Sequence, residues 1–389
     1  MIGVICEYNP FHNGHERQLS LIRERYGADA AILCLMSGSF VQRGAPAVFD
    51  KQTRARAALL CGADLVLELP LTCALRSAEG FAEGGVSILT RLGCGVLCFG
   101  SESGDSNKLM STARLLLDPE LDRRLLSHLQ TGVSYPTARQ LALQELGGAE
   151  LTQPNDILAV EYCKAIRRQN SQMACFAVKR EGEYHADGLD ASAPSAEAIR
   201  AVLDRPAEWC ASVPERVREL YEAAPRYSMR AGERAVLARL RTLRDEDFAA
   251  LPFGGEGLWR RFLRACRSCG SVEEIIAQTK TKRYTRTRIQ RMLLCAYLGL
   301  TRQDLEREAP HVRILGFTPR GRTLLRELRN GTGDASLSGF ELVDSGQTPA
   351  DRAYYALECR AADLYALFCE DERRLAPGSE QAARNIRLF

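Results

Sequence analysis

The chain has 389 residues, of which 46% are hydrophobic and 26% are charged, so it can build cores for roughly two or three domains. Its formal net charge of +3 excludes an overall basic character, and nucleic-acid binding must therefore be argued from local clusters. No stretch approaches the ~18 uninterrupted apolar residues that cross a bilayer, and the first residues have neither the basic nor the apolar region of a signal peptide. We expect a cytoplasmic protein with no membrane association.

Up to residue 206, short apolar runs alternate with segments whose apolar residues recur at helical spacing. Continuous apolar strands separated by helices indicate a parallel sheet covered on both faces, which is a doubly wound α/β domain. The predicted strands are Ile2–Cys6, Ala30–Met36, Asp64–Leu69, Val96–Phe99 and Cys175–Lys179. The predicted helices are Gly14–Tyr26, Lys51–Cys61, Ser77–Leu92, Asn107–Leu117, Pro119–Gln130, Thr137–Leu146, Asn155–Arg168 and Ala196–Leu203.

The chain changes character beyond Pro206. Helical patterns dominate there, arginine becomes frequent, and only Val312–Phe317 and Phe340–Val343 resemble strands. We therefore predict an α/β domain over residues 1–205 and a mainly helical, arginine-rich domain over residues 206–389. The 14 cysteines are scattered, mostly in apolar runs, and are expected to be buried free thiols. The single CxxC, Cys266 and Cys269, has no second pair at zinc-finger spacing, and its role stays open.

The segment Glu7–His15 lies directly between the first predicted strand and the first predicted helix. Ligands bind at this edge of a doubly wound sheet, and the helix points its N-terminal amides at them, which suits phosphate. Gly14 lets a ligand approach the backbone, while His12 and His15 can donate hydrogen bonds to phosphate oxygens from one side of the helix start. The alternative is that both histidines only cap or pack at the helix start.

The residues His12-Asn13-Gly14-His15 resemble the HxGH signature of the nucleotidyltransferase superfamily, which includes the class I aminoacyl-tRNA synthetases. A longer ordered set of segments is similar to the tRNA(Met) cytidine acetate ligases, and a softer match continues in the C-terminal half. These segments are Gly3–His15, Ser37–Gly44, Gly62–Pro70, Phe99–Glu102, Asn155–Leu158 with Glu161 and Tyr162, Ser195–Arg200, and then Lys282–Thr285, Arg288–Arg291 and Arg313–Phe317.

The resemblance implies a Rossmann-like (HUP) nucleotidyltransferase domain that binds ATP, followed by a mainly helical domain that is expected to bind tRNA. Enzymes of this family join acetate to ATP, which gives acetyl-adenylate and pyrophosphate. They then pass the acetyl group to the wobble cytidine of elongator tRNA(Met), forming N4-acetylcytidine. A magnesium ion is expected with ATP, its ligands unidentified, and no protein partner is implied.

The resemblance also implies which residues of this chain form the site. His12 and His15 are expected to be catalytic. The expected ATP contacts are Glu7, Tyr8, Asn9, Pro10, Phe11, His12, Asn13, Gly14, His15, Gly100, Asn155, Arg180, Ser195 and Arg200.

Several of these residues have a plainer alternative. Asn155 could read an adenine or ribose edge or could only cap its helix, and Arg180 could neutralise phosphate or remain a solvated surface charge. Ser195 and Arg200 occupy the place of the superfamily's second phosphate motif, but the chain lacks the usual Ser-Thr pair, so a simple helix cap is the alternative for Ser195.

Three further expectations concern the strand ends and the C-terminal half. Gln42 and Arg43 could contact acetate or phosphate. Asp64 and Glu68 could bind magnesium, although ordinary solvation at a strand end is favoured. The segment 280–291 carries six basic residues and no acidic one, so it is expected to grip tRNA phosphates, with a solvated basic face as the alternative. The residues expected to bind tRNA are Lys282, Arg283, Tyr284, Arg286 and Arg288.

Two other functions remain possible from the sequence. A small-molecule adenylyltransferase shares the HxGH signature, but such enzymes need little beyond the α/β domain. A noncatalytic RNA-binding protein could retain the fold, but the intact histidines and flanking glycines argue against that function.

Overall fold

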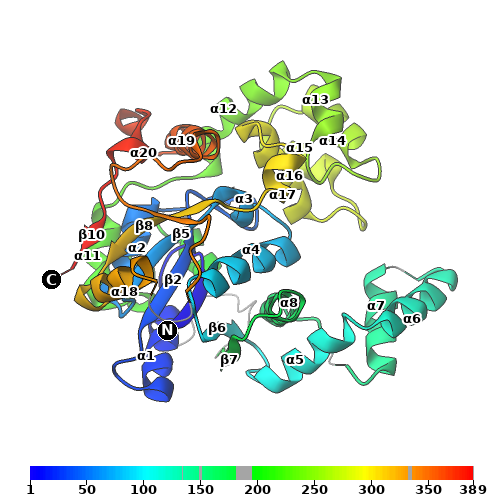
Figure 1. Cartoon of the computed structure of the whole chain (residues 1–389). Coiled ribbons are helices and arrows are strands. Elements are labelled where there is room, and N and C mark those ends of the chain that lie inside the picture. The colour runs from blue at the N-terminus through cyan, green and yellow to red at the C-terminus, as the bar shows by residue number, and fades with distance from the viewer. Residues whose placement is uncertain (134, 149–150, 181–194, 332–334, 389) are drawn as a thin grey trace.

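The structure is a computed structural model that describes residues 1–133, 135–148, 151–180, 195–331 and 335–388 (Figure 1). Within these residues, the largest unit is an eight-stranded sheet with the order β10-β8-β5-β2-β1-β6-β7 and with β9 beside β8. The strands are β1 (Ile2–Cys6), β2 (Ile32–Ser37), β5 (Leu65–Leu69), β6 (Val96–Ser101), β7 (Ala174–Lys179), β8 (His311–Phe317), β9 (Glu341–Val343) and β10 (Ile386–Arg387). A separate hairpin joins β3 (Phe40–Val41) to β4 (Ala45–Pro46).

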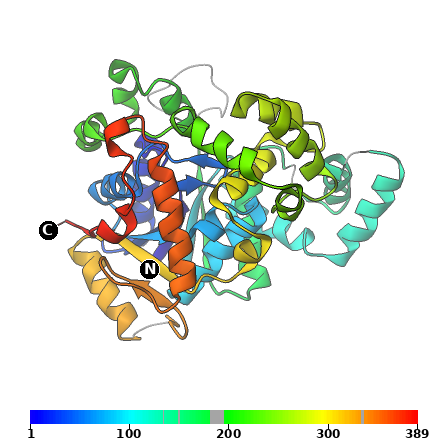
Figure 2. The same ribbon diagram turned by 90° about the horizontal axis from the view of Figure 1, so that it is seen from above.

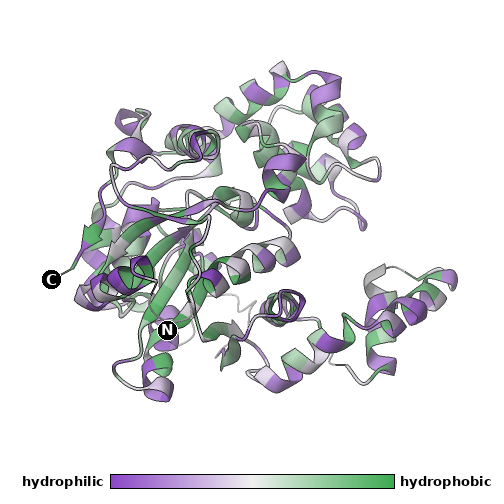
Figure 3. Cartoon of the chain, in the orientation of Figure 1, coloured by the Kyte–Doolittle hydropathy of each residue, from purple (hydrophilic) through white to green (hydrophobic). Residues whose placement is uncertain are grey.

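The central strands alternate their side chains between two apolar cores, as strands buried on both faces must. Ile5 and Leu35 face α4 (Ala78–Arg91) and α8 (Pro154–Arg168), whereas Val4 faces α1 and α2 on the opposite side of the sheet. Figure 3 shows the result as apolar strands enclosed by helices whose outer surfaces are polar. This arrangement confirms the predicted doubly wound α/β fold. The other helices nearest this sheet are α1 (Asn13–Tyr26), α2 (Lys51–Leu60), α3 (Leu71–Ala74), α5 (Ser106–Leu115), α9 (Ala196–Ala201), α10 (Pro206–Trp209), α11 (Glu215–Ala223) and α18 (Pro319–Arg329).

Two groups of helices have cores of their own. A helical lobe packs around Phe262, Leu294 and Phe368, and it reaches the sheet domain through Phe40 of β3. The helices α6 and α7 pack on each other through Leu121, Leu125 and neighbouring side chains, and both views show this pair extending away from the sheet (Figures 1 and 2). These helices are α6 (Pro119–Gln130), α7 (Tyr135–Glu145), α12 (Met229–Thr242), α13 (Asp245–Ala250), α14 (Leu258–Ser268), α15 (Val272–Thr279), α16 (Arg286–Leu298), α17 (Arg302–Glu306) and α19 (Arg352–Ala366).

The sheet extends across the expected domain boundary at residue 206. Strand β8 pairs antiparallel with β5, so that Leu65 lies opposite Phe317, and β10 adds a further strand beside β8. Residues 206–389 therefore contribute three strands to the sheet as well as the helical lobe. None of the helices in the described ranges is long and apolar enough to cross a lipid bilayer.

Asp64 and Glu68 have structural partners instead of a metal or solvent. The Asp64 carboxylate accepts hydrogen bonds from Arg23 at 3.0 Å and from the Ile32 amide at 2.9 Å, which fixes the start of β2. The Glu68 carboxylate accepts from the Lys51 ammonium at 2.7 Å. The solvated strand end that the sequence favoured is therefore wrong for both residues, because each carboxylate is paired inside the fold.

Lys51 is the centre of a buried ion cluster that fastens the C-terminal segment to the sheet. Its ammonium lies 2.5 Å from Glu380 of α20 (Ser379–Ala382), and Arg313 of β8 pairs with the same carboxylate. The Glu380 side chain is only 1% exposed. Burial alone would raise the pKa of the Glu380 carboxyl, but Lys51 and Arg313 hold that pKa below its usual value. The carboxylate therefore balances two buried cations.

Replacing Glu380 with alanine should lower the free energy of unfolding by about 3–5 kcal/mol, because Arg313 would lose the carboxylate it pairs with in a buried position and Lys51 would retain only Glu68. Urea unfolding followed by tryptophan fluorescence measures this change. The matched control is Glu370→Ala, which removes an exposed carboxylate and should change stability by no more than about 0.5 kcal/mol. Equal effects of the two substitutions would contradict the assignment.

Candidate active site

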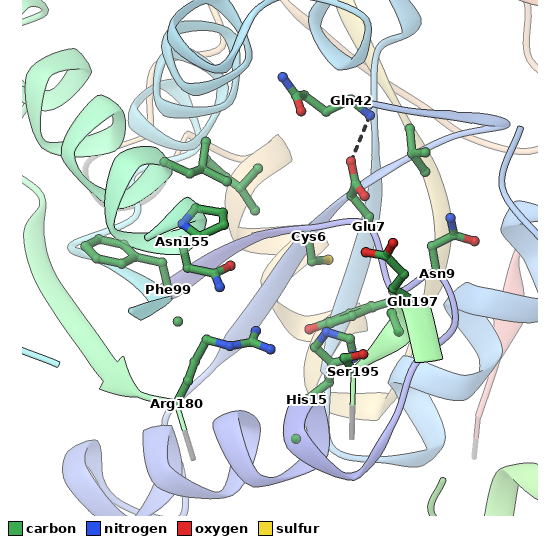
Figure 4. Close-up of a pocket in the computed structure, with 18 of the residues that line it drawn as sticks. Cys6, Glu7, Asn9, His15, Gln42, Phe99, Asn155, Arg180, Ser195 and Glu197 are labelled. Carbon is green, nitrogen blue, oxygen red and sulfur yellow. Dashed lines mark hydrogen bonds between the residues drawn. The ribbon is translucent and has the colours of Figure 1, made fainter. Parts of the chain in front are cut away.

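A cavity of about 460 Å³ opens at the carboxyl ends of the parallel strands β1, β6 and β7 (Figure 4). Its wall is formed by the loop after β1, the β3–β4 hairpin, and the first turns of α1, α8 and α9. This is the crevice where the sequence predicts a ligand. Eleven of the expected ATP contacts line it, namely Glu7, Tyr8, Asn9, His12, Gly14, His15, Gly100, Asn155, Arg180, Ser195 and Arg200.

The two histidines are fixed by the main chain of the same turn. His12 is the N-cap of α1, and its Nδ1 accepts a hydrogen bond from the Gly14 amide at 3.1 Å. His15 reaches back so that its own Nδ1 accepts from the His12 amide at 3.2 Å. The rings stack with their centroids 3.8 Å apart. Because each Nδ1 accepts a hydrogen bond from a main-chain amide, we assign the ring proton of each neutral imidazole to Nε2. The pair therefore offers two N–H donors to a ligand.

Both imidazoles are held in the neutral form. Burial, together with the nearby Arg180 and Arg200 guanidinium groups, lowers the pKa of His12 to about 3. Burial, His12 and Arg180 likewise hold the pKa of His15 well below its usual value. Two charged rings in stacked contact would repel each other, so the stacked geometry is consistent with two neutral imidazoles. The pair is suited to donating hydrogen bonds and is poorly suited to accepting a proton.

The backbone that carries the histidines is held by Arg54 of α2. This side chain is completely buried, and its guanidinium donates to the carbonyl oxygens of Glu7 at 2.7 Å and Ser37 at 2.9 Å. It also donates to the Phe49 carbonyl at 2.9 Å and to the Gly38 carbonyl. One cation thus ties together the chain as it leaves β1, the chain as it leaves β2, and the entry to α2.

Three of the expected ATP contacts turn away from the cavity. Pro10 and Phe11 are buried; the Phe11 amide donates to the Tyr221 hydroxyl at 3.0 Å, and Phe11 belongs to the core beneath the loop. Asn13 donates to the Ala211 carbonyl at 2.8 Å, outside the cavity lining. The loop from Glu7 to His15 therefore contains both side chains that line the cavity and side chains that anchor the loop to the rest of the fold.

Two arginines bring positive charge to the histidine side of the cavity. Arg180 follows β7, where its amide donates to the Ser101 carbonyl at 2.9 Å, and Figure 4 shows its guanidinium directed toward His15. Arg200 lies on α9 and donates to the Asn9 carbonyl at 2.6 Å. Burial lowers the pKa of both guanidinium groups.

Ser195 and Asn155 differ in whether they cap the helix that they begin. The Ser195 hydroxyl accepts from the Ala198 amide at 3.1 Å, so it does cap α9, although the residue also lines the cavity. Asn155 lies inside the first turn of α8 and donates to Glu102 at 2.6 Å. The Glu102 carboxylate also accepts from the Asp156 amide at 2.8 Å, so it is Glu102 that satisfies the start of the helix. Asn155 is therefore not the cap, and its amide faces the cavity (Figure 4).

Gly100 leaves open space at the end of β6. The atoms nearest to a Cβ at this position belong to the Arg180 side chain, the first of them at 3.5 Å, which is an ordinary contact distance. Contact with Arg180 therefore does not require glycine here, and the missing side chain widens the cavity between β6 and Arg180.

The opposite side of the cavity is built by contacts that the sequence did not reveal. The Glu7 carboxylate accepts a hydrogen bond from the Gln42 amide at 2.8 Å (Figure 4). Phe81, Phe99 and Tyr162 form an apolar wall, in which the Phe99 and Tyr162 ring centroids lie 5.6 Å apart. Gln42 and Arg43 both line the cavity as expected, but Arg43 also pairs with Glu197 at 3.5 Å. These contacts join segments distant in the chain, so the sequence singled out Glu7, Gln42 and Arg43 without revealing how they pair, and it did not single out Phe81.

The expected tRNA-binding segment is partly neutralised by carboxylates from elsewhere in the chain. Arg283 and Arg288 each pair with Glu256 at 3.3 Å, and Arg286 donates to Glu273 at 2.6 Å. The Tyr284 hydroxyl donates to a main-chain carbonyl at 2.6 Å. The sequence of segment 280–291 therefore suggested more positive charge than the folded structure has there, because Glu256 and Glu273 lie beside this segment in space.

The same segment leads directly to the cavity. It begins α16, and Arg291 in that helix donates to the Gln42 carbonyl at 3.3 Å. Gly44, in the β3–β4 turn, approaches so closely that a Cβ there would lie 2.5 Å from the Arg291 amide nitrogen. The basic segment and the cavity wall are thus one continuous structure.

The family model described as HIGH Nucleotidyl Transferase matches residues 1–378 of this chain. The tRNA(Met) cytidine acetate ligase of Acetivibrio thermocellus is 34% identical over 415 residues, covering 99% of this chain and 99% of the relative. That of Caldicellulosiruptor saccharolyticus is 36% identical over 382 residues, covering 94% and 93%. The chain belongs to the tRNA(Met) cytidine acetate ligase family. The resemblance seen in the sequence motifs is therefore confirmed.

Solved structures agree with this membership of the tRNA(Met) cytidine acetate ligase family. Thermotoga maritima TmcAL bound with alpha-thio ATP is 31% identical, with a TM-score of 0.88, over 100% of this chain and 99% of that chain. The apo form of the same protein is 32% identical with a TM-score of 0.90, over 100% and 99%. The family's nucleotidyltransferase fold thus extends over the whole chain, including the strands and helices after residue 206.

The neutral histidine pair gives a prediction about pH. His12 should show no protonation between pH 8 and pH 5, whereas a histidine in a peptide titrates near 6.5. The unfolded chain binds more protons than the folded chain in the interval from about 6.5 to about 3, so this residue's stabilising contribution is lost as the pH falls through it. Imidazole NMR resonances, assigned with His12→Gln and His15→Gln, measure the titration. A midpoint near that of the peptide would contradict the assignment.

Proposed function

We propose that this protein uses ATP to activate acetate as acetyl-adenylate and transfers the acetyl group to the wobble cytidine of elongator tRNA(Met), forming N4-acetylcytidine. The observation that carries the proposal is the cavity at the β1 edge, where two neutral imidazoles and two arginines meet in a chain of this family. We place the reaction in the cytoplasm, where ATP and tRNA are both available.

The first step needs charge neutralisation and alignment more than a covalent nucleophile. An acetate oxygen attacks the α-phosphorus of ATP, a bond to the acetyl carboxylate forms, and pyrophosphate leaves. The Nε2–H groups of His12 and His15 donate to phosphate oxygens as charge accumulates on them. Arg180 and Arg200 neutralise the phosphates, and the N-terminal amides of α1 face the same anions.

The remaining cavity residues would hold the rest of the nucleotide. Asn155 can bind an adenine or ribose edge through its amide, and Gly100 allows the nucleotide to lie against the end of β6. The Ser195 hydroxyl oxygen already accepts from the Ala198 amide at the start of α9, which leaves the hydroxyl proton for a phosphate. Pro10, Phe11 and Asn13 would support the loop without touching ATP.

Magnesium is expected to accompany ATP, but the described residues do not form a cage for it. No group of three or more His, Cys, Asp or Glu side chains with metal-binding geometry is found among residues 1–133, 135–148, 151–180, 195–331 and 335–388. Near the cavity, Glu102 is occupied by the α8 amides and Glu197 pairs with Arg43. A magnesium ion would thus be bound mainly by phosphate oxygens and water.

The proposal is tested with purified protein, ATP, carbon-13-labelled acetate and tRNA. Pyrophosphate release and labelled N4-acetylcytidine, detected by nucleoside mass spectrometry, should both depend on ATP and acetate. Acetyl-CoA without ATP should give no product. ATP consumption with no modified nucleoside would indicate a small-molecule adenylyltransferase, and tRNA binding with no pyrophosphate release would indicate a noncatalytic RNA-binding protein.

His12→Ala and His15→Ala should each slow acetyl-adenylate formation by roughly two orders of magnitude, the scale for one lost transition-state donor. The control is His128→Ala, because His128 lies on α6 and pairs with Glu145 outside the cavity. Wild-type adenylate formation by the double variant would contradict the mechanism.

We further propose that the basic segment docks tRNA phosphates near the cavity entrance. Lys282, Arg283 and Arg286 are exposed, Arg288 is half-buried, and Arg291 in the same helix contacts the cavity wall. Tyr284 could stack on a splayed base if its hydroxyl keeps its main-chain contact. The ion pairs to Glu256 and Glu273 would have to exchange for phosphate contacts, which lowers the net gain from each arginine.

Changing Lys282, Arg283, Arg286 and Arg288 to serine should weaken tRNA binding and reduce its salt dependence by about one unit of slope per lost phosphate contact. Acetyl-adenylate formation without tRNA should persist. The matched variant Glu256→Gln releases two arginines from their carboxylate and should strengthen binding at low salt. Filter binding over a salt series measures both effects, and normal binding by the quadruple variant would place the docking surface elsewhere.

A further inference from the structure

The second step of the proposed reaction requires a proton acceptor. The exocyclic N4 amine of cytidine attacks the acetyl carbonyl of acetyl-adenylate, a carbon–nitrogen bond forms, and the carbon–oxygen bond to AMP breaks. One N4 proton must leave during this exchange, because the product is a neutral amide. The group that accepts the proton must face the cavity and be ionised near neutral pH.

The histidines do not meet this requirement. Each Nδ1 already accepts a main-chain hydrogen bond, and the ring proton lies on the nitrogen that faces the cavity. Burial and the neighbouring arginines also lower the pKa of His12 to about 3, which makes it a weak base. The histidine pair can therefore stabilise negative charge but cannot readily take a proton from an amine.

Most other titratable groups of the described cavity lining are also excluded. Burial raises the pKa of the Cys6 thiol and of the Tyr8 and Tyr162 hydroxyls, so these groups remain protonated near neutral pH. The Glu197 side chain is 67% exposed at the rim and pairs with Arg43. Lys179, Arg17, Arg180 and Arg200 are cations.

Among the lining residues that the structure describes, Glu7 is the carboxylate that remains, and it is well positioned. It lies at the end of β1 between Cys6 and the motif loop, and its main-chain carbonyl is held by Arg54 at 2.7 Å. Its Oε1 accepts from the Gln42 amide at 2.8 Å, which fixes the direction of the carboxylate (Figure 4). The second carboxylate oxygen, Oε2, can then accept a proton, and both the main chain and the side chain of Glu7 are held in place.

The resemblance implies an ATP contact for Glu7, but the charge of the ligand argues against a contact with the phosphates. A triphosphate and a carboxylate repel each other, so the phosphates would be held by the arginines and histidines, whereas the Glu7 carboxylate is turned toward the β3–β4 hairpin. The apolar residues Phe81 and Tyr162 line this cavity and provide surfaces against which a flat base can pack. The cavity thus has a phosphate side and a side suited to an uncharged nucleobase.

We propose that Glu7 is the catalytic base of the transfer step, an inference that rests on the proposed function. Its Oε2 accepts a proton from the cytidine N4 amine as that nitrogen bonds to the acetyl carbon. AMP leaves with the electron pair of the broken carbon–oxygen bond, and Glu7 later releases its proton to water. The main-chain amide of Gln42 orients the carboxylate.

The test is Glu7→Gln, which keeps an oxygen that can accept from the Gln42 amide but removes the base. Acetate-dependent exchange of labelled pyrophosphate into ATP should remain close to the wild-type rate. Single-turnover transfer to tRNA should slow by about two to four orders of magnitude. Hydroxylamine attacks acetyl-adenylate without needing a base, so acetohydroxamate formation should also persist. The control Glu370→Gln, at an exposed carboxylate outside the cavity lining, should leave both steps close to wild type.

Each outcome decides the proposal. Loss of exchange, or a raised KM for ATP with normal transfer, would make Glu7 a nucleotide contact and overturn its role as a base. Normal transfer by Glu7→Gln would overturn it equally. A wild-type protein that shows no acetate-dependent exchange would instead refute the proposed function itself, so the two failures are distinguishable.

Discussion

The burial of the Arg54 guanidinium determines the geometry on which the cavity depends. Taking a cation out of water is costly unless its donors are satisfied, and here four carbonyl oxygens accept from it. Those carbonyls belong to the chain leaving β1, the chain leaving β2 and the entry to α2. Because all three converge on one rigid planar group, the loop that carries the histidines has a defined position before any ligand arrives.

This fixed loop separates two kinds of chemistry within one cavity. His12 and His15 face it as neutral donors, accompanied by Arg180 and Arg200, so that side favours anions. Glu7 lies five residues before His12 on the same loop but is oriented by the β3–β4 hairpin through Gln42. Opposite preferences for charge can coexist because each group is held by main-chain contacts instead of by direct pairing with the other. A carboxylate paired with a nearby arginine would cancel both functions.

The sequence predicted the features that depend on local pattern. The apolar strands, the helix start at His12 and the crevice after β1 all follow from short-range periodicity and from the HxGH spacing. It did not predict that Phe11 and Asn13 anchor the loop, because a sequence motif does not show which of its side chains face the cavity. It also missed the neutralisation of Arg286 by Glu273 and the pairing of Glu68 with Lys51. Those partners are close only after the chain has folded.

The antiparallel pairing of β5 with β8 also constrains how the molecule can be made. Leu65 and Phe317 lie opposite each other although some 250 residues separate them, so β5 remains an unpaired edge while the intervening chain is synthesised. An apolar edge strand exposed on a ribosome-bound chain is a template for wrong pairing. Such non-local contacts also slow folding, because a long loop must close before they form. Nascent chains of this protein should accordingly depend on a holding chaperone until the β8 segment has emerged.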